Sequence, residues 1–421
     1  MSRGSHDMKI VQICSGYKIS HNGGITNYVR ALSSELAGYG HEVYVIDSSS
    51  KVANLDCYDF NVIRNCDNKL KPFHLNSSLN NSDYGKIEEI LDRIKPDVIH
   101  IHMMIDLPWS ILELAKKKSK VVVSLHDYSY ICKRITMMNN FDELCMGSKS
   151  GENCNRCISS LETNVYSNYL LKKLNYRFKQ KIIKLFPSNK NEKDFDYVRE
   201  RLANVDLLVA VSSRVKEIYL NNGMYNENFV VNHIGNITAD TPKNKEFTPR
   251  KKIILGFIGS FSKYKGADVI LNIAEQLDKS RYQIELYGLI DDAYVSKIGM
   301  LDIISYKGKY QQHELGKILE NVDLGLVLPI WEDNAPQVVF EFLNNGIPVL
   351  CSEMGGIPDF VQHDVNGLVI GNGLSNFESV VSDMNSDYFD QKLQKLTLNV
   401  KSTKTISMHN KEIMGLYENI I

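Results

Sequence analysis

The sequence has neither a long hydrophobic run nor an excess of one charge, and each absence removes a class of function. No window approaches the roughly 18 consecutive apolar residues that a transmembrane helix needs, and the start of the sequence shows no signal-peptide pattern. The formal net charge is −1, so no global electrostatic attraction to nucleic acid is expected. We therefore expect a cytoplasmic protein without a nucleic-acid partner, in which any anion site is local.

Repeats and a disulfide framework are also missing. The sequence contains no short tandem repeat and no low-complexity tract. Eight cysteines in a chain of this length, without a secretory signal, predict reduced thiols rather than disulfides. The length of 421 residues exceeds what one typical hydrophobic core fills. Two domains of about 200 residues each are therefore expected.

Two segments of the chain begin in the same way, with a buried strand, a glycine-containing loop and an amphipathic helix. In the first, a strand over 9–14 precedes a loop that ends at Gly23 and Gly24, and a helix over 25–36 follows. In the second, a strand over 253–258 precedes the loop 259–266 and a helix over 267–277. Two such starts predict two doubly wound α/β domains.

Further apolar runs predict the remaining strands of two parallel sheets. They lie over 42–46, 97–101, 121–125, 206–211, 283–287, 323–328 and 348–352. Most of these runs are apolar nearly throughout, as expected where both faces of a parallel sheet are covered. The polar stretch 236–249 is the expected hinge. Domains are therefore predicted over 8–238 and 239–405, with a final segment 406–421 that forms a helix from about His409.

The densest group of chemically informative residues lies between 328 and 367. The chain reads Leu-Pro-Ile-Trp-Glu-Asp-Asn-Ala-Pro-Gln-Val-Val-Phe-Glu-Phe over 328–342 and Gly-Gly-Ile-Pro-Asp over 355–359. We interpret the first run as a strand end, a turn and a helix start, with Asp333 and Asn334 at a helix N-terminus that attracts anions. Asp333 and Glu341 are eight residues apart, about two helical turns along one face.

This pattern resembles the C-terminal donor-binding motif of glycosyltransferase family 4, whose members are retaining enzymes of the GT-B fold. The residues in register with the family's acid-x7-acid motif are Trp331, Asp333, Asn334, Pro336, Val338 and Glu341. The first acid is Asp where Glu is usual, one methylene shorter, and the adjacent Glu332 is an alternative. The resemblance implies that Asp333 contacts the donor sugar and Glu341 the ribose.

Three other loops extend the resemblance, which covers residues 8–421 and is weakest over about 50–90. Lys265 matches the lysine that holds the donor diphosphate, whereas Ser260 stands where arginine is common and Lys263 is a further cation. His126, which begins a His-Asp-Tyr motif after a strand, matches a residue near the reacting sugar. The donor-binding residues implied are Gly23, Gly24, Ser260, Lys265, Asn334, Ala335, Pro336, Gln337, Val338 and Glu341, and the catalytic residues implied are His126 and Asp333.

The resemblance also implies a reaction. A departing nucleoside diphosphate gathers negative charge that cations and N–H dipoles stabilise. Configuration would be retained, by front-face attack assisted by the leaving phosphate, without a metal or other cofactor in catalysis. The donor would be a UDP- or GDP-linked sugar. The acceptor would be a glycan or a lipid-linked molecule in the synthesis of a surface polysaccharide. In these terms 8–238 is the acceptor-side domain, 239–405 the donor domain, and 406–421 a helix that crosses back to the first domain.

Two other functional classes stay open at this point. A catalytically silent GT-B subunit that binds donor or acceptor for a partner would fit the shortened acid at Asp333 and the missing arginine at Ser260. A different GT-B enzyme, such as a sugar-nucleotide epimerase, would fit the fold. The Asp-x-Asp pattern at Asp194 and Asp196 is typical of metal-dependent transferases, but it lies in a charged stretch that indicates an exposed helix.

Two segments suggest binding outside the donor site. Cys132, Cys145, Cys154 and Cys157 lie in one polar segment, and one Cys-x2-Cys pair with two further thiols is compatible with a structural zinc or with free thiols. Residues 168–186 alternate basic and apolar side chains without an acid. That pattern fits either a helix packed on the sheet or a peripheral contact with the inner face of the cell membrane. His100 and His102 are interpreted as structural or rim residues of a strand end.

Overall fold

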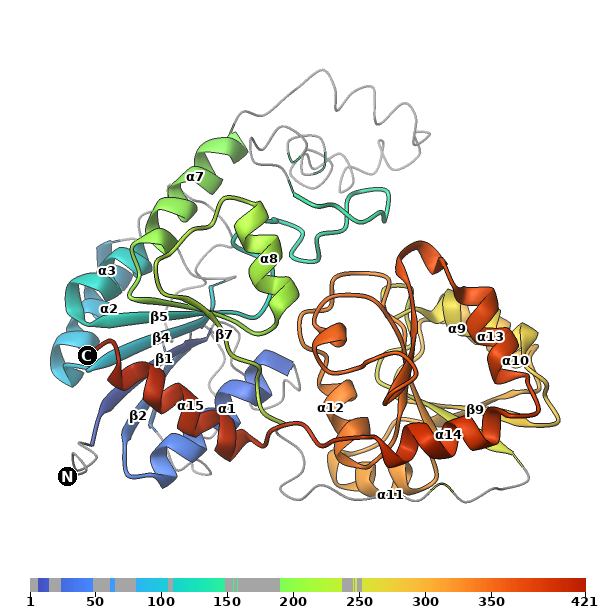
Figure 1. The fold of residues 1–421 in the computed structure, drawn as a ribbon. Coiled ribbons are helices and arrows are strands. Elements are labelled where there is room, and N and C mark those ends of the chain that lie inside the picture. Colours follow the sequence, from blue (N-terminus) through green and yellow to red (C-terminus); the bar gives the residue numbers. More distant parts are fainter. Residues whose placement is uncertain are drawn as a thin grey trace. The chain divides into compact units, whose positions relative to one another are not determined.

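The computed structural model describes residues 7–14, 24–47, 61–64, 81–104, 109–147, 154, 157, 190–236, 245, 247 and 252–421. The chain forms two compact units, one made of Met1–Ile234 with Ile406–Ile421 and the other of Gly235–Thr405. The colours in Figure 1 show that the chain builds the first unit, then the second, and returns to the first with helix α15 (Ile406–Glu418). The final helix thus begins three residues earlier than expected.

The first unit is a seven-stranded parallel sheet with helices on both sides. Its strands are β1 (Lys9–Cys14), β2 (Glu42–Asp47), β3 (Asn61–Arg64), β4 (Val98–Met103), β5 (Lys120–Leu125), β6 (Leu207–Ala210) and β7 (Phe229–Val231). They lie in the order β3-β2-β1-β4-β5-β6-β7, and each pairing is parallel. The described helices are α1 (Gly24–Gly38), α2 (Asn81–Ile94), α3 (Ser110–Lys118), α7 (Lys190–Ala203) and α8 (Ser213–Asn221).

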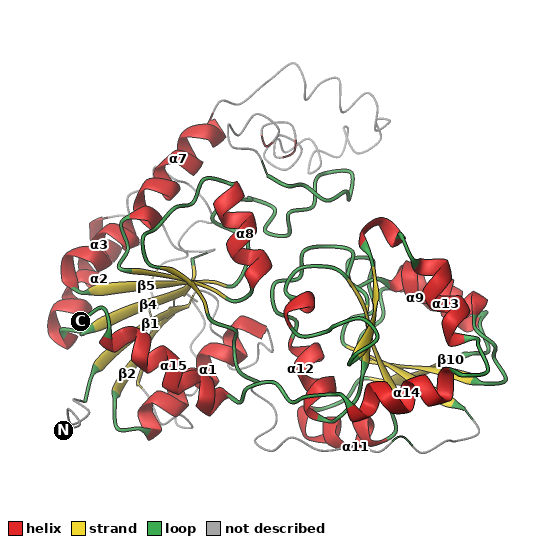
Figure 2. Cartoon of the chain, viewed as in Figure 1, coloured by secondary structure: helices red, strands yellow, loops and turns green. Residues whose placement is uncertain are grey.

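The second unit repeats this architecture with six strands. They are β8 (Ile253–Ile258), β9 (Tyr282–Tyr287), β10 (Ile304–Gly308), β11 (Leu324–Val327), β12 (Val349–Ser352) and β13 (Gly367–Ile370), in the parallel order β10-β9-β8-β11-β12-β13. The helices are α9 (Ala267–Gln276), α10 (Asp292–Gly299), α11 (Leu315–Glu320), α12 (Gln337–Asn344), α13 (Phe377–Met384) and α14 (Phe389–Leu398). Figure 2 shows the alternation of helix and strand in both units. The predicted pair of Rossmann-like domains is confirmed.

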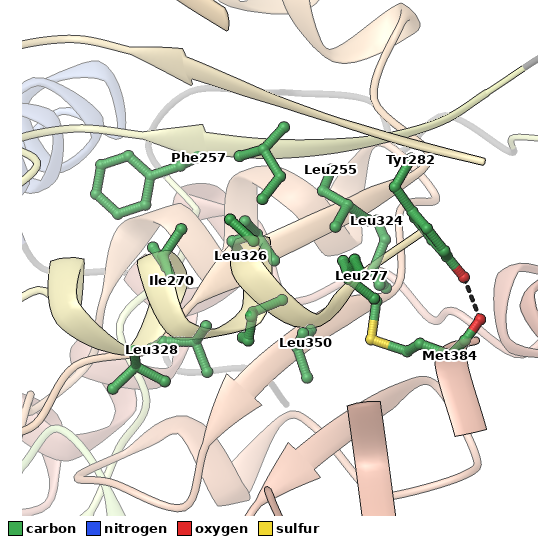
Figure 3. Packing of buried hydrophobic residues seen from close by; sticks show 14 of the residues in the cluster. Leu255, Phe257, Ile270, Leu277, Tyr282, Leu324, Leu326, Leu328, Leu350 and Met384 are labelled. Carbon is green, nitrogen blue, oxygen red and sulfur yellow. Dashed lines mark hydrogen bonds between the residues drawn. The ribbon is translucent and has the colours of Figure 1, made fainter. Parts of the chain in front are cut away.

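The apolar runs form the central strands because helices cover both faces of each sheet. In the second unit, side chains of β8, β9 and β11 pack with α9, α10, α13 and α14 into one buried cluster (Figure 3). Leu255 and Leu326 are among its members, and the Tyr282 hydroxyl donates a hydrogen bond to the Met384 carbonyl. On the other face, α12 lies so close to β11 that a Cβ at Gly325 would meet the Phe342 ring at 2.5 Å.

Helix α15 packs against α1 in the first unit, where the end of the chain meets its beginning (Figure 1). Buried polar contacts fix the pairing. The Tyr28 hydroxyl of α1 lies 2.7 Å from His409 Nε2, and the Tyr417 hydroxyl lies 2.6 Å from His100 Nδ1. None of the helices in the described ranges is both long and apolar enough to cross a membrane.

Close packing between β8 and the turn before β11 makes Gly256 sensitive to added volume. A Cβ at Gly256 would lie 2.6 Å from a Val322 methyl, so we expect Gly256→Ala to destabilise the second unit by about 1–3 kcal/mol. Urea unfolding measures this difference. Gly299→Ala is the matched control, because a Cβ there meets nothing within 4 Å at the end of α10. Equal stability of the two variants would contradict the packing described.

Candidate active site

The second unit brings two loops together at the point where its strand order reverses. The chain proceeds outward from β8 in one direction through β9 and β10, and in the other through β11, β12 and β13. In a parallel α/β sheet, ligands bind beyond the carboxyl ends of the strands at this switch point. The loops that leave β8 and β11 are 259–266 and 328–336. They carry Lys265 and Asp333.

The loop after β8 is a tight turn that leads into α9. Its backbone closes on itself, since the Ser262 carbonyl accepts hydrogen bonds from the amides of Lys265 and Ala267. Gly266 adopts φ +85°, and a Cβ there would lie 1.8 Å from the Leu328 carbonyl oxygen. Only glycine therefore allows the two loops to approach this closely. This turn places Lys265 directly before Gly266, the residue at which the two loops come together.

The loop after β11 is held by hydrogen bonds on several sides. The Ile330 amide donates to the Tyr264 carbonyl of the first loop at 3.0 Å, and the Ser352 hydroxyl donates to the Pro329 carbonyl at 2.6 Å. The Gly356 amide donates to the Asp333 carbonyl, while Glu332 accepts from the Gly355 amide at 2.9 Å. The Glu332 carboxylate is thus used to anchor the 355–356 turn.

The two loops present an ion pair at the switch point. Lys265 Nζ lies 2.5 Å from Asp333 Oδ2 and 5.6 Å from the centre of the Trp331 ring. The Asp333 side chain is 11% exposed, whereas the Lys265 side chain is 43% exposed. The lysine therefore reaches into solvent from a site whose carboxylate is largely enclosed. An exposed cation beside an enclosed acceptor suits a ligand that carries both an anionic group and hydroxyls.

The structure corrects the expectation that Asp333 and Glu341 share a helix face. Helix α12 begins only at Gln337, because Pro336 has an extended backbone (ψ 115°) and a proline disfavours helical conformation in the residue before it. Asp333 and Asn334 are therefore loop residues that precede the helix, and both are buried. Glu341 lies within α12 and is 7% exposed. The spacing of eight residues is bridged by a loop and one turn of helix.

Tyr310 is a neighbour of Glu341 that sequence reasoning missed. It follows β10 in the chain, and burial together with the Glu341 charge raises the pKa of its phenol. The sequence offered one signal, an aromatic residue just past the carboxyl end of a strand. β10 itself is too polar to be recognised as a strand, so the sequence did not indicate that Tyr310 follows one.

His126 lies in the first unit immediately after β5, the strand next to β4 in the sheet. The turn that follows it is fixed locally, since Asp127 Oδ1 accepts a hydrogen bond from the Ser129 amide at 2.8 Å. The Tyr219 hydroxyl of α8 donates to the Asp127 carbonyl at 2.6 Å. Burial lowers the pKa of His126 to about 3, so its imidazole is neutral at physiological pH. Its Nε2 lies 3.1 Å from Nδ1 of His102.

The remaining predicted site residues fall in different surroundings. Gly24 is the exposed first residue of α1, and Ser260 is exposed in the loop after β8. Ala335 and Val338 are partly exposed on either side of the α12 start, and Gln337 is its first residue. Gly23 and the segment 168–186 lie outside the described residues. Asp196 is exposed on α7, where it pairs with Arg199.

The four cysteines of the polar segment share one neighbourhood. Burial raises the pKa of Cys154 to about 12, and the neighbouring Cys132, Cys145 and Cys157 contribute to that rise. Across the described part of the chain, no three His, Cys, Asp or Glu side chains are arranged so as to hold a metal ion. A structural zinc at these cysteines stays a prediction of the sequence.

Two Rossmann-like units in one chain are the architecture of the GT-B class of glycosyltransferases. The chain belongs to Glycosyltransferase Family 4, whose family model matches residues 22–235. Residues 239–396 match the family model described as Glycosyl transferases group 1. The two matches confirm the family predicted from the motif around Asp333 and Glu341.

Solved glycosyltransferases share this fold along nearly the whole chain. HepE of Anabaena, solved with UDP and glucose, aligns with a TM-score of 0.63 at 13% identity, covering 98% of this chain and 99% of that one. The lipopolysaccharide outer core galactosyltransferase WaaB aligns with a TM-score of 0.59 at 14% identity, covering 98% and 100%. At these identities the likeness demonstrates the common fold.

Curated relatives match a shorter part of the chain. Protein CapJ of Staphylococcus aureus is 30% identical in an alignment of 139 residues that covers 31% of this chain and 35% of CapJ. An uncharacterized 42.6 kDa protein in the cps region of Klebsiella pneumoniae is 23% identical in an alignment of 307 residues that covers 68% of this chain and 65% of that protein. The chain thus matches about a third of the length of the first curated relatives.

Proposed function

We propose that the protein is a retaining, metal-independent glycosyltransferase that moves a sugar from a nucleoside diphosphate to a glycan or lipid-linked acceptor of a surface polysaccharide. The observation that carries this proposal is the Lys265–Asp333 pair at the switch point of the second unit. A UDP-linked donor is favoured because HepE was solved with UDP and glucose. The polysaccharide setting is supported by relatives in a cps region and by CapJ.

Each residue has a separate role in this proposal. Lys265 holds the diphosphate and neutralises the charge that develops as it leaves. Asp333 accepts hydrogen bonds from hydroxyls of the donor sugar, and Glu341 accepts them from the ribose, as the family resemblance implies. His126 meets a hydroxyl of the reacting sugar as a neutral imidazole. No protein nucleophile is assigned, because front-face attack uses the leaving phosphate as the base.

Calorimetric titration with UDP, GDP, ADP and dTDP tests the donor site. We expect one nucleotide, UDP, to bind with micromolar affinity, and Glu341→Ala to weaken that binding at least about tenfold, since a hydrogen bond to a charged group is worth about 1.5–3 kcal/mol. Glu341→Gln keeps the shape of the side chain without its charge and separates lost binding from lost packing. Glu378→Ala, at an exposed glutamate of α13, is the matched control.

Three results would redirect the assignment. If folded wild-type protein bound no nucleotide, the donor site would be refuted. If a nucleotide bound but no sugar were released with any acceptor, the chain would be a binding subunit for a partner enzyme. Nucleotide release that does not depend on an acceptor would instead indicate an epimerase-like GT-B enzyme.

A further inference from the structure

Two side chains in the segment that carries Asp333 bury polar atoms for which the protein supplies no partner. Among the described residues, Trp331 Nε1 and both polar atoms of the Gln337 side chain are buried and have no hydrogen-bond partner. A buried indole N–H usually has one, because a donor withdrawn from water without a replacement costs free energy. Trp331 lies in the loop after β11, and Gln337 is the first residue of α12. Unused hydrogen-bonding atoms at the switch point of a parallel sheet indicate a polar ligand.

The backbone around Trp331 is held by hydrogen bonds, which restricts where its ring can lie. The Ile330 amide donates to the Tyr264 carbonyl at 3.0 Å, and the Trp331 carbonyl accepts a hydrogen bond from the Asp333 amide at 2.8 Å. Lys265 Nζ lies 5.6 Å from the centre of the indole ring, within the range of cation–π attraction. The indole N–H and the lysine ammonium are therefore neighbouring donors that come from two different loops.

The partner that suits both donors is an acceptor with negative charge. Asp333 is the carboxylate nearby, but it pairs with Lys265 and not with the indole. Charge-assisted hydrogen bonds are about 2.8 Å long, so two of them that meet on one phosphate group span a separation like that between the lysine and the ring. A single phosphate can therefore contact Lys265 and Trp331 together.

A second donor at this place also bears on the loop after β8. Ser260 stands where the family resemblance expects an arginine, and Ser260 is exposed. A diphosphate carries several negative charges and offers many acceptor oxygens, so one lysine does not use all of them. The indole N–H is a donor only, and it adds a directed hydrogen bond without adding charge.

We propose that Trp331 is a binding residue for the donor diphosphate, and that its Nε1–H donates a hydrogen bond to an oxygen of the phosphate that Lys265 holds. This inference rests on the proposed function, in which Lys265 faces the diphosphate. Trp331 thereby supplies the hydrogen bond that the arginine absent at Ser260 would make. A nucleoside without phosphates gains nothing from this contact.

Trp331→Phe removes the N–H and keeps an aromatic ring. In calorimetric titration with UDP, we expect the Kd of Trp331→Phe to be about tenfold higher than that of the wild type, since one hydrogen bond to a charged group is lost. Displacement by uridine, which lacks the phosphates, should give the same Kd for both proteins. Trp109→Phe is the matched control, because Trp109 packs on Tyr130 in the first unit. Urea unfolding verifies that both variants are folded.

The indole N–H can also be observed directly, because the chain contains two tryptophans. In nuclear magnetic resonance of the full chain labelled with 15N-tryptophan, Trp331→Phe identifies the signal of Trp331. Saturating UDP should shift its indole proton downfield, as expected when the N–H donates to a phosphate oxygen, whereas uridine should leave it near its position in the free protein. The signal of Trp109 serves as the internal reference.

The outcomes separate this inference from the proposed function. Unchanged UDP affinity in folded Trp331→Phe, or a Trp331 signal that UDP does not move, overturns the role of Trp331 while the donor site stands. Equal losses of affinity for UDP and for uridine would place Trp331 against the nucleoside and overturn the phosphate contact. If the wild type bound no UDP, the proposed function itself would fail, and this inference with it.

Discussion

Replacing Lys265 with alanine should lower the rate of sugar transfer by about 10²–10³-fold, the range expected when one group that stabilises developing negative charge is removed. Lys265 Nζ lies 2.5 Å from Asp333 Oδ2 and is exposed enough to reach a ligand. In the proposed reaction it faces the diphosphate, whose charge increases as the sugar bond breaks. The loss should therefore fall on kcat and on kcat/KM together. Steady-state release of nucleotide with saturating acceptor measures both.

Two companion variants separate this role from general electrostatics and from stability. Lys263→Ala removes the same charge from an exposed position in the same loop, and we expect less than about a tenfold effect, because screened charges at the surface interact weakly. Lys265→Arg keeps the charge. Partly exposed ion pairs contribute about 0–1 kcal/mol, so the melting temperature of Lys265→Ala should hardly change. Equal losses at positions 263 and 265 would refute the specific role of Lys265.

The fold could be predicted because the central strands of a parallel sheet are buried on both faces. β1 and β8 were predicted with the bounds that the structure has, and the other central strands to within two residues. The strands that escaped prediction are β3, β7, β10 and β13, which occupy the four sheet edges. An edge strand has one neighbour and needs no continuous apolar run. β10 illustrates this, since its five residues are all at least partly exposed.

The candidate site was predictable residue by residue but not in its geometry. Lys265 and Asp333 were singled out separately, and their contact depends on Gly266, whose positive φ brings the two loops together. The start of α12 was predicted too early, because Pro336 is extended and disfavours helical conformation in the residue before it. The anchoring of Glu332 by Gly355 joins positions 23 apart in the chain, and local patterns do not encode such a contact.

The contacts of the buried histidines His100 and His102 could not be predicted from the sequence for the same reason. His100 and His102 were interpreted as structural or rim residues, and the structure places both in the interior. Their partners come from distant segments: Tyr417 is 317 positions from His100, and His409 reaches Tyr28 across 381. Alternation along a strand indicated which way the two side chains point. It could not indicate that the last helix of the chain would cover them.

These buried histidines lead us to expect that the first unit loses stability steeply as the pH falls below about 6.5. Burial lowers the pKa of His100, His102 and His126, whereas in the unfolded chain they return to about 6.5. Below that pH the unfolded state binds more protons than the folded state, so the free energy of unfolding decreases as the pH is lowered. The stability that these histidines contribute is complete above pH 6.5. It is lost progressively as the pH falls toward their low pKa values in the folded state. At pH 5 each histidine should lower the free energy of unfolding by about 2 kcal/mol, and the three together by about 6 kcal/mol.

A loss of this size is comparable with the whole stability of many domains, so the unit should be close to unfolded at pH 5. Trp109 is buried in the first unit and Trp331 lies in the second. Urea unfolding followed by the fluorescence of Trp109 in a Trp331→Phe background therefore reports on the first unit alone. His100→Gln should reduce the slope of stability against pH by about a third. A flat profile between pH 7.5 and 5 would mean that these imidazoles accept protons in the folded state, and that water or an acid reaches them.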